Sequence, residues 1–555
     1  MHKIFAAVAA MAAALMAASC REQSPDSYLP PEFGPVEVSL NGFSATAQCK
    51  VTGPEDGFSY GFVLQEGSGA QPQEIALKPS EGVLSNVFEE LTPSTDYIIK
   101  AFATNGINTV TSAEHSFRTA KEEDVTPTVS IPDPAFRKYI LSKFDRDNDG
   151  RLSQDEAEGI SEIECCTDDI RSIEGVECFS SLERLICRGS GTDSGRRTGL
   201  LTKVDLSRNY RLRYIEVDGN NLTELILPDK SSNIDDIHCI LNKLKSLDVS
   251  KCPKLKTLWC WENDLSSLDL SNNQLLKDLR CALNDFSDGL DVSSNKELRY
   301  LYCEGSFMPS IDVSENIELI ELGCWDNAIK SIDVTHNPEL SVLECANNLL
   351  KTIDISQNPL LSKFTCEDNY LKEIDVSHNP ELRTFHCDNN QISSIDISML
   401  THLENLSIGD NNITEPVDLS LFPDLTDYGG NNLPLSRIPD FSHNPKLQSL
   451  HLCGSGGAIY LDEGFFRQWP EIKGFNIGGY PGESIDLSLN TKMETLWMGD
   501  MTNVKVLDLS ASPHLRFIWL NGCSKLETVY LHKDVDISRL EINKEGTHDA
   551  KIEFK

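Results

Sequence analysis

The chain has 555 residues, with 86 acidic and 49 basic side chains and a formal net charge of −37. This charge argues against a nucleic-acid partner, because no basic footprint is present, and it favours solubility and cation binding. The length exceeds that of one ordinary core, so it predicts several domains or an array of repeats that grows by contacts between neighbours.

The first residues predict export. Lys3 precedes an apolar run at residues 4–16 that is too short to span a bilayer and is typical of a secretory signal peptide. The sequence Ala17-Ala18-Ser19-Cys20 resembles a lipoprotein signal-peptidase site, which predicts lipidation of Cys20; ordinary cleavage beside an incidental cysteine is the alternative. We therefore expect a signal peptide at 1–19, a tether at 20–33, and an exported lipoprotein of the outer membrane or cell surface that contacts the membrane only through its lipid.

Residues 34–120 predict a small all-β domain. Short strand-like runs at 36–40, 45–51, 59–65, 83–88, 97–104 and 111–119 are separated by Gly, Pro and polar turns. The sequence from Leu91 to Tyr97 resembles the tyrosine corner of fibronectin type III domains, in which the tyrosine hydroxyl binds upstream backbone. The resemblance implies a β-sandwich that serves as a spacer, with direct ligand binding as the alternative. A linker is expected at 121–131.

Residues 132–161 predict a helical cap that contains a calcium loop. The segment 145–156 matches the twelve-residue EF-hand pattern, in which carboxylates, one backbone carbonyl and a final glutamate surround calcium. The predicted ligands are Asp145, Asp147, Asp149, the Arg151 carbonyl, Ser153 (through a water) and Glu156. A helix–loop–helix cap that no longer binds calcium is the alternative. Because a single loop is visible, we expect a structural ion in the cap and no paired calcium sensor.

From residue 162 to 555 the sequence predicts a repeat array. Cysteines recur at intervals of 21 residues, with one of 22, at Cys239, Cys260, Cys281, Cys303, Cys324, Cys345, Cys366 and Cys387. Each lies in the frame L-x-x-L-x-C-x-x-N-x-L, which is the signature of leucine-rich repeats. In one copy Leu340, Leu343 and Cys345 alternate as inward residues of a short strand, and Asn348 ends it by satisfying buried backbone groups. Too few residues remain for a return helix, so 3₁₀ or extended return segments are expected.

The same register extends to both ends of the array. It predicts roughly 16 to 18 coils, and the outer ladder positions are Cys165, Cys187, Val217, Ile408, Leu452, Ile477, Met498, Leu520 and Ile542. An insertion at 188–199 and an irregular glycine-rich segment at 429–482 break the rhythm.

The ladder cysteines are expected to be small buried apolar side chains. Metal or redox chemistry is the alternative, but C-x₂-C pairs are absent and neighbouring thiols come from separate coils. The repeat resembles the cysteine-ladder leucine-rich repeats of internalin J-like surface adhesins over residues 160–545. The resemblance implies a horseshoe that binds proteins or glycans without catalysis.

Aspartates also recur once per repeat, for example at Asp333, Asp354 and Asp375. They are expected to accept backbone N–H bonds in the return turn, with a ladder of bound cations as the alternative.

Aromatic residues recur at strand positions expected to face outward from the core. The predicted ligand-binding patch is Trp259, Trp261, Tyr300, Tyr302 and Trp325, and a second group at Trp497, Phe517 and Trp519 lies near the C-terminus. Exposed aromatic side chains anchor protein partners and stack on sugars; lateral packing along the strands is the alternative.

The sequence thus predicts a surface lipoprotein that is not an enzyme, with calcium as its cofactor. An extracellular protein, glycoprotein or glycan is the expected partner. A glycan-capture protein that serves nutrient uptake and a structural envelope protein are the alternatives.

Overall fold

The computed structural model describes residues 30–41, 43–53, 57–67, 70–121, 128–228, 233–454, 465–544 and 550–555. The chain divides into two compact units, Met1–Pro127 and Thr128–Lys555. The predicted signal peptide and Cys20 lie outside the described residues. No helix in the described ranges is long and apolar enough to cross a bilayer.

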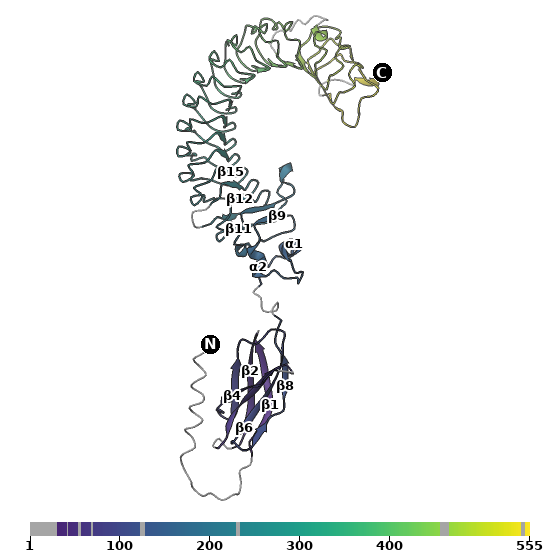
Figure 1. Ribbon diagram of the computed structural model, residues 1–555. Helices are drawn as coiled ribbons and strands as arrows, with labels where there is room; N and C mark the ends of the chain where they lie inside the picture. The colour runs from purple at the N-terminus through teal and green to yellow at the C-terminus, as the bar shows by residue number, and fades with distance from the viewer. Residues whose placement is uncertain are drawn as a thin grey trace. The chain divides into compact units, whose positions relative to one another are not determined.

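The first unit is an all-β sandwich (Figure 1). One sheet has the order β1-β2-β5, and the other has the order β4-β3-β6-β7, with β8 also paired to β6. The strands are β1 (Glu32–Asn41), β2 (Ser44–Thr52), β3 (Ser59–Glu66), β4 (Gln73–Leu77), β5 (Val83–Phe88), β6 (Asp96–Thr104), β7 (Thr109–Thr111) and β8 (His115–Arg118). The Tyr97 hydroxyl accepts the Thr92 N–H at 2.9 Å, as the tyrosine-corner resemblance implies.

The second unit begins with two short helices. Helix α1 (Pro134–Phe144) starts at Asp133, whose side chain accepts the N–H groups of Ala135 and Phe136, and it buries Phe136 and Ile140 in the core. Helix α2 (Gln154–Glu158) starts at Ser153 in a capping box with Glu156. Both helices close the apolar end of the repeat array.

The rest of this unit is a leucine-rich-repeat solenoid, in which the coils follow a horseshoe-shaped arc (Figure 1). Consecutive strands pair in parallel through one main sheet. Its strands are β9 (Glu162–Cys166), β10 (Arg184–Arg188), β12 (Tyr214–Glu216), β14 (Asp236–His238), β15 (Thr257–Trp259), β16 (Asp278–Arg280), β17 (Tyr300–Tyr302), β18 (Glu321–Gly323), β19 (Val342–Glu344), β20 (Lys363–Thr365), β21 (Thr384–His386), β22 (Asn405–Ser407), β23 (Asp427–Gly429), β24 (Ser449–Leu452), β25 (Gly474–Gly478), β26 (Thr495–Gly499), β28 (Phe517–Asn521) and β30 (Glu541–Asn543).

The return segments are mostly turns, and the expected extended or 3₁₀ segments form only in some coils, with strands near the two ends of the solenoid. Strands β11 (Lys203–Asp205) and β13 (Glu224–Ile226) pair in parallel, and β27 (Val506–Leu509), β29 (Thr528–Leu531) and β31 (Lys551–Phe554) form a second small sheet. Among the described residues there are also three short 3₁₀ helices, η2 (Val176–Cys178), η3 (Thr192–Ser194) and η4 (Phe465–Arg467).

The predicted register holds through most of the main sheet and fails at its last strand. Strands β23 to β25 continue the sheet through the segment 429–482 that breaks the sequence rhythm. Ile542, however, pairs with Ile518 and does not align with Leu520, so its assignment to the ladder position was wrong by two residues. The last coil starts its strand later in its repeat, where a cysteine no longer marks the register.

Asparagine side chains connect successive coils. The Nδ2 of Asn348 donates to the Cys324 and Cys345 carbonyls at 3.0 and 3.2 Å, and its Oδ1 accepts the Ile329 N–H at 3.0 Å. Equivalent bonds recur at Asn369 and Asn390. As predicted, the asparagine satisfies loop groups that the core would otherwise leave unpaired.

The repeated aspartates hold the return turns. The Oδ1 of Asp354 accepts the Ser356 N–H at 2.9 Å, and the same bond forms at Asp333 and Asp375. Hydrogen bonds from Ser356 lower the pKa of Asp354. The turn-stabilising role is therefore confirmed in the structure.

The ladder cysteines lie in the core. Cys260, Cys281, Cys303 and Cys324 are free thiols with no exposed surface. Burial raises the pKa of Cys260 to about 12 and, with smaller effects from nearby carboxylates, that of Cys324 to about 12. Because the thiolate is the form that binds metals and attacks disulfides, these cysteines act as apolar packing residues.

Candidate functional site

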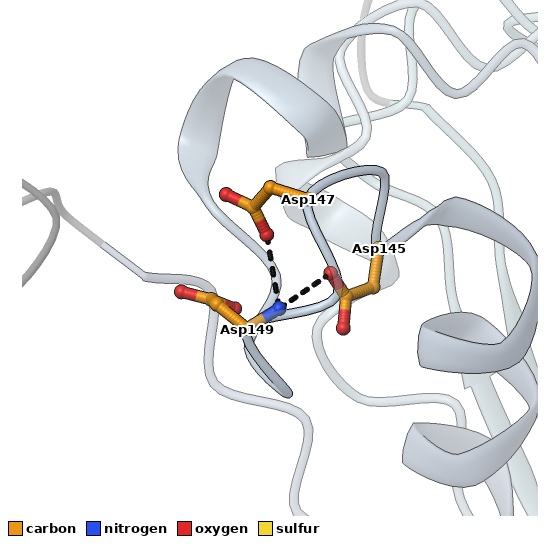
Figure 2. Close-up of side chains that lie close together, drawn as sticks. All are labelled: Asp145, Asp147 and Asp149. Carbon is orange, nitrogen blue, oxygen red and sulfur yellow. Dashed lines mark hydrogen bonds between the residues drawn. The ribbon is translucent and has the colours of Figure 1, made fainter.

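Three of the predicted calcium ligands converge in the loop between α1 and α2. One ligand oxygen from each of Asp145, Asp147 and Asp149 lies within 4.8 Å of the others, and the side chains of Asp145 and Asp147 both face the Asp149 backbone N–H (Figure 2). Calcium binds oxygens at about 2.3–2.6 Å, so oxygens on opposite sides of the ion are about 4.8 Å apart. The spacing of the three carboxylates fits a single calcium coordination shell.

The loop backbone is shaped around these carboxylates. The Asp149 N–H donates to Asp145 at 3.2 Å and to Asp147 at 3.1 Å, and the Gly150 N–H donates to Asp145 at 2.9 Å. Asn148 and Gly150 have positive φ, which turns the chain sharply at the positions where the EF-hand pattern needs it. The Asp149 N–H bond acts to lower the pKa of Asp147, but desolvation and the carboxyl groups of Asp149 and Asp145 raise it overall.

The final predicted ligand, Glu156, is held at the far end of the loop. Its Oε1 accepts the Arg146 N–H at 2.7 Å, and its Oε2 accepts the Ser153 N–H and hydroxyl at 3.0 and 2.9 Å. Burial acts to raise the pKa of Glu156, but these hydrogen bonds lower it overall. The structure does not group Glu156 with the three aspartates, and it binds its own loop instead.

Asp133 joins this cap to the solenoid. Its Oδ1 caps helix α1, and its Oδ2 accepts the N–H groups of Arg171 and Ser172 at 3.0 and 3.3 Å. The sequence analysis missed this residue. Its place just before Pro134 is an N-cap signal, but the bond to a return segment 38 residues away is visible only in the fold.

The exposed face of the main sheet consists of rows of side chains that run across the coils. We call the residues directly before and after each ladder cysteine the pre-cysteine row and the post-cysteine row. The pre-cysteine row contains His238, Trp259, Arg280, Tyr302, Gly323, Glu344, Thr365 and His386, which the strand register aligns. The post-cysteine row contains Ile240, Trp261, Ala282, Glu304, Trp325, Ala346, Glu367 and Asp388.

The predicted aromatic patch is therefore divided between rows. Trp259 and Tyr302 belong to the pre-cysteine row, Trp261 and Trp325 belong to the post-cysteine row, and Tyr300 lies at the start of β17. Trp325 is 40% exposed, whereas the other four side chains are half-buried. At about 4.8 Å per strand, Trp261 and Trp325 are separated by about 14 Å.

The pre-cysteine row forms a stack from His238 to Tyr302. The His238 ring lies parallel to Trp259 at 4.2 Å between centroids, and the Arg280 guanidinium lies 4.6 Å from the Trp259 ring and 5.3 Å from the Tyr302 ring. Asp278 holds Arg280 through a 3.1 Å bond from Nε. Trp259 and Tyr302 thus pack laterally, as the alternative interpretation proposed, and the stack makes this face rigid.

Gly323 makes room for part of the stack. A Cβ at this position would lie 2.6 Å from Cδ1 of Tyr302, so the ring occupies the space that a side chain would take. The Tyr302 hydroxyl also bonds to the Glu321 carboxylate.

The second aromatic group contains a stacked pair of indoles. The indoles of Trp497 and Trp519 are parallel within 1° at 4.3 Å, Phe517 lies 6.1 Å from Trp519, and Trp497 is 37% exposed.

The solved structures that this fold resembles are repeat proteins, whereas no protein-family model and no curated protein matches the sequence. The functional domain of InlJ from Listeria monocytogenes, which includes a cysteine ladder, is 24% identical over 73% of this chain and 81% of that chain, with a TM-score of 0.49. An internalin, InlF, from the same organism is 18% identical over 67% of this chain and 95% of that chain, with a TM-score of 0.47. The leucine-rich effector YopM from Yersinia pestis is 18% identical over 65% and 92% of the two chains, with a TM-score of 0.47.

Proposed function

We propose that this protein is an exported, non-catalytic binding protein that holds an extracellular protein or glycoprotein on the concave face of the solenoid. The observation that carries the proposal is the continuous exposed face of the main sheet, on which stacked side chains from successive coils are already ordered. A surface fixed before binding loses little side-chain entropy when the partner arrives, and aromatic anchors contribute most at interfaces. Cys20 would carry the lipid, and the first unit would serve as a spacer.

Substitutions in the predicted aromatic patch test this proposal. The double change Trp261→Ala and Trp325→Ala, made in the chain from residue 21 onward, should weaken binding to a partner found on a glycoprotein and glycan array more than tenfold, because two anchors of about 2 kcal/mol each are lost. Tyr370→Ala is the matched control, since Tyr370 is 48% exposed but lies beyond the post-cysteine row, three residues after Glu367. Equal binding by the double variant and the wild type, with equal melting temperatures, would refute the assignment.

Glycan capture is a second candidate function for the C-terminal group. The stacked indoles of Trp497 and Trp519, of which Trp497 is 37% exposed, offer an aromatic surface of the kind that contacts sugars. Loss of binding to array glycans in Trp497→Ala, with binding to glycoprotein backbones retained, would support this candidate.

We also propose that the cap binds calcium. The donor set consists of hard oxygen ligands, and the three carboxylates fit one coordination shell. Glu156, Ser153 and the Arg151 carbonyl would complete it after Glu156 exchanges its hydrogen bonds with Arg146 and Ser153 for the ion. The ion would fix the cap on the first coil.

A further inference from the structure

The exposed face of the sheet is acidic from β17 to β23. Every residue from 300 to 431 is described, and the strand and post-cysteine positions there carry Glu304, Glu321, Glu344, Glu367, Asp388 and Asp427. Lys363 is the one lysine or arginine at these positions, and it already pairs with Glu344. The other carboxylates form no ion pair with a lysine or arginine among the described residues, although Arg280 of the preceding coil is close enough to offset part of the increase that burial causes in the pKa of Glu304.

In the post-cysteine row, carboxylates lie on both sides of an accessible indole. The backbone register continues beyond the strands, because the Glu304 carbonyl accepts the Leu283 N–H at 2.8 Å and the Trp325 carbonyl accepts the Gly305 N–H at 3.0 Å. The Glu367 carbonyl accepts the Asn347 N–H of the preceding coil in the same way, at 2.8 Å. Glu304 and Trp325 are therefore neighbours at about 4.8 Å in backbone spacing, and Glu367 follows two coils further on.

Two of these carboxylates, Glu304 and Glu367, are partly removed from water, which disfavours their charged form. The Oε2 atoms of Glu304 and Glu367 are buried and have no hydrogen-bond partner among the described residues. Burial raises the pKa of both groups, with a further increase from Glu344; Arg280 partly offsets it at Glu304. Partly desolvated carboxylates without a partner are costly, so a cation that reaches them is bound favourably.

The chain itself shows which cation this surface accommodates. The Arg280 guanidinium already lies between the Trp259 and Tyr302 rings, with Asp278 holding its nitrogen atoms. The post-cysteine row repeats these components, with an indole at Trp325 beside the carboxylate of Glu304, but it supplies no guanidinium. A planar guanidinium both stacks on indole and pairs with carboxylate in two-point fashion, which an ammonium cannot do.

We infer that the partner docks an extended arginine-rich protein segment along the post-cysteine row, between Glu304 and Asp388. The inference rests on the proposed function and specifies the chemistry of its partner. The segment runs across the coils and places successive guanidinium groups beside Glu304, Trp325 and Glu367.

The probe for this inference is a synthetic peptide of alternating arginine and glycine, compared with versions in which lysine or citrulline replaces arginine. The wild-type chain should bind the arginine peptide most tightly and the citrulline peptide least. The triple change Glu304→Gln, Glu367→Gln and Asp388→Asn should weaken binding of the arginine peptide at least tenfold, because it neutralises the row without shortening a side chain.

A matched variant distinguishes peptide binding at this row from nonspecific attraction of the peptide to an acidic protein. Asp333→Asn, Asp354→Asn and Asp375→Asn remove the same charge from the return turns, and asparagine keeps the acceptor that each turn uses. This variant should bind the peptide within twofold of the wild type at 150 mM salt. Equal weakening in both triple variants, or equal affinity for the arginine and lysine peptides, would overturn the inference.

Failure of this inference is distinguishable from failure of the proposed function. If the arginine peptide does not bind but the array partner is still lost in Trp261→Ala with Trp325→Ala, only the cationic segment is refuted. If the array partner is unaffected by that double variant as well, the concave face is not the binding surface.

Discussion

At the scale of single residues, similar positions of the repeat carry groups with opposite effects on stability. The ladder thiols are buried and neutral, so they add to the core. Asp218 follows the ladder residue Val217 and is also buried, at 4% exposure, where its Oδ1 accepts the Ile240 N–H at 2.8 Å. Burial raises the pKa of Asp218 to about 7; Glu216 adds to the shift, and His238 and Arg188 oppose it.

The Asp218 carboxyl should make stability depend on pH. Its folded pKa is raised above the unfolded value of 3.8, so the charged form is penalised on folding, and its contribution to stability is lost as pH rises from 3.8 through 7. Asp218→Asn keeps the acceptor and should raise the free energy of unfolding at pH 8 by roughly 1–3 kcal/mol, with little effect at pH 4. Denaturant melts at the two pH values measure this, and Asp354→Asn, which should give no gain at pH 8, is the control. A gain of the same size at both pH values would contradict the assignment.

The ladder cysteines should react only after unfolding. Titration of the thiols with a maleimide should label few of them in the native chain and all of them in denaturant, because their pKa is raised by burial. Cys324→Ser should lower the free energy of unfolding by about 1–3 kcal/mol, since a hydroxyl replaces a thiol in an apolar site. Isolation of a disulfide between Cys324 and Cys345 from the native protein would disprove the ladder of free thiols.

At the scale of elements, the regular repeat allowed the strands of the cysteine ladder to be predicted from the sequence. The fixed spacing of leucine, cysteine and asparagine placed the strands and inward residues of the ladder from Cys239 to Cys387, because a 21-residue coil has room for one register. Strand β4 was missed, since its sequence Gln73-Glu74-Ile75-Ala76-Leu77 does not alternate and it becomes a strand by pairing with β3. Extended return segments were expected, but the pairing of β27, β29 and β31 into a sheet was not predicted.

The candidate sites were predictable to different degrees. The three aspartates of the calcium loop are local in sequence, and the structure brings them together. The stack of His238, Trp259 and Arg280 joins three separate coils, so it is invisible unless residues directly before successive cysteines are compared. Trp259 and Tyr302 were predicted from their strand positions. Arg280 between them was not predicted, because only aromatic residues were considered.

The calcium loop is tested by the effect of the ion on the cap. The wild-type chain should melt at a higher temperature with calcium than with a chelator, because an ion that binds only the folded state stabilises it. Glu156→Gln and Asp147→Asn should each remove most of this difference, whatever their effect without calcium. The control is Asp155→Asn, since Asp155 lies in α2 outside the predicted ligand set. Melting temperatures independent of calcium in the wild type, with no heat of binding by calorimetry, would exclude the site.

At the scale of the whole molecule, the solenoid turns a short repeat into a long recognition surface. Each coil adds one strand and a few outward side chains, and neighbouring coils order them by stacking and hydrogen bonding. Acidic and aromatic side chains on the concave face are then fixed with a spacing set by the backbone, about 4.8 Å per coil. The surface therefore distinguishes a partner whose side chains match this spacing from a partner that only carries the opposite charge.

The central claim, that the partner lies on the concave face, is tested most directly by hydroxyl-radical footprinting of the chain with and without the partner identified on the array. Binding should slow oxidation of Trp261 and Trp325, leave exposed Tyr370 unchanged and leave buried Trp469 unreactive in both states. Unchanged oxidation of Trp325 in the saturated complex, with protection on the return turns instead, would contradict the account.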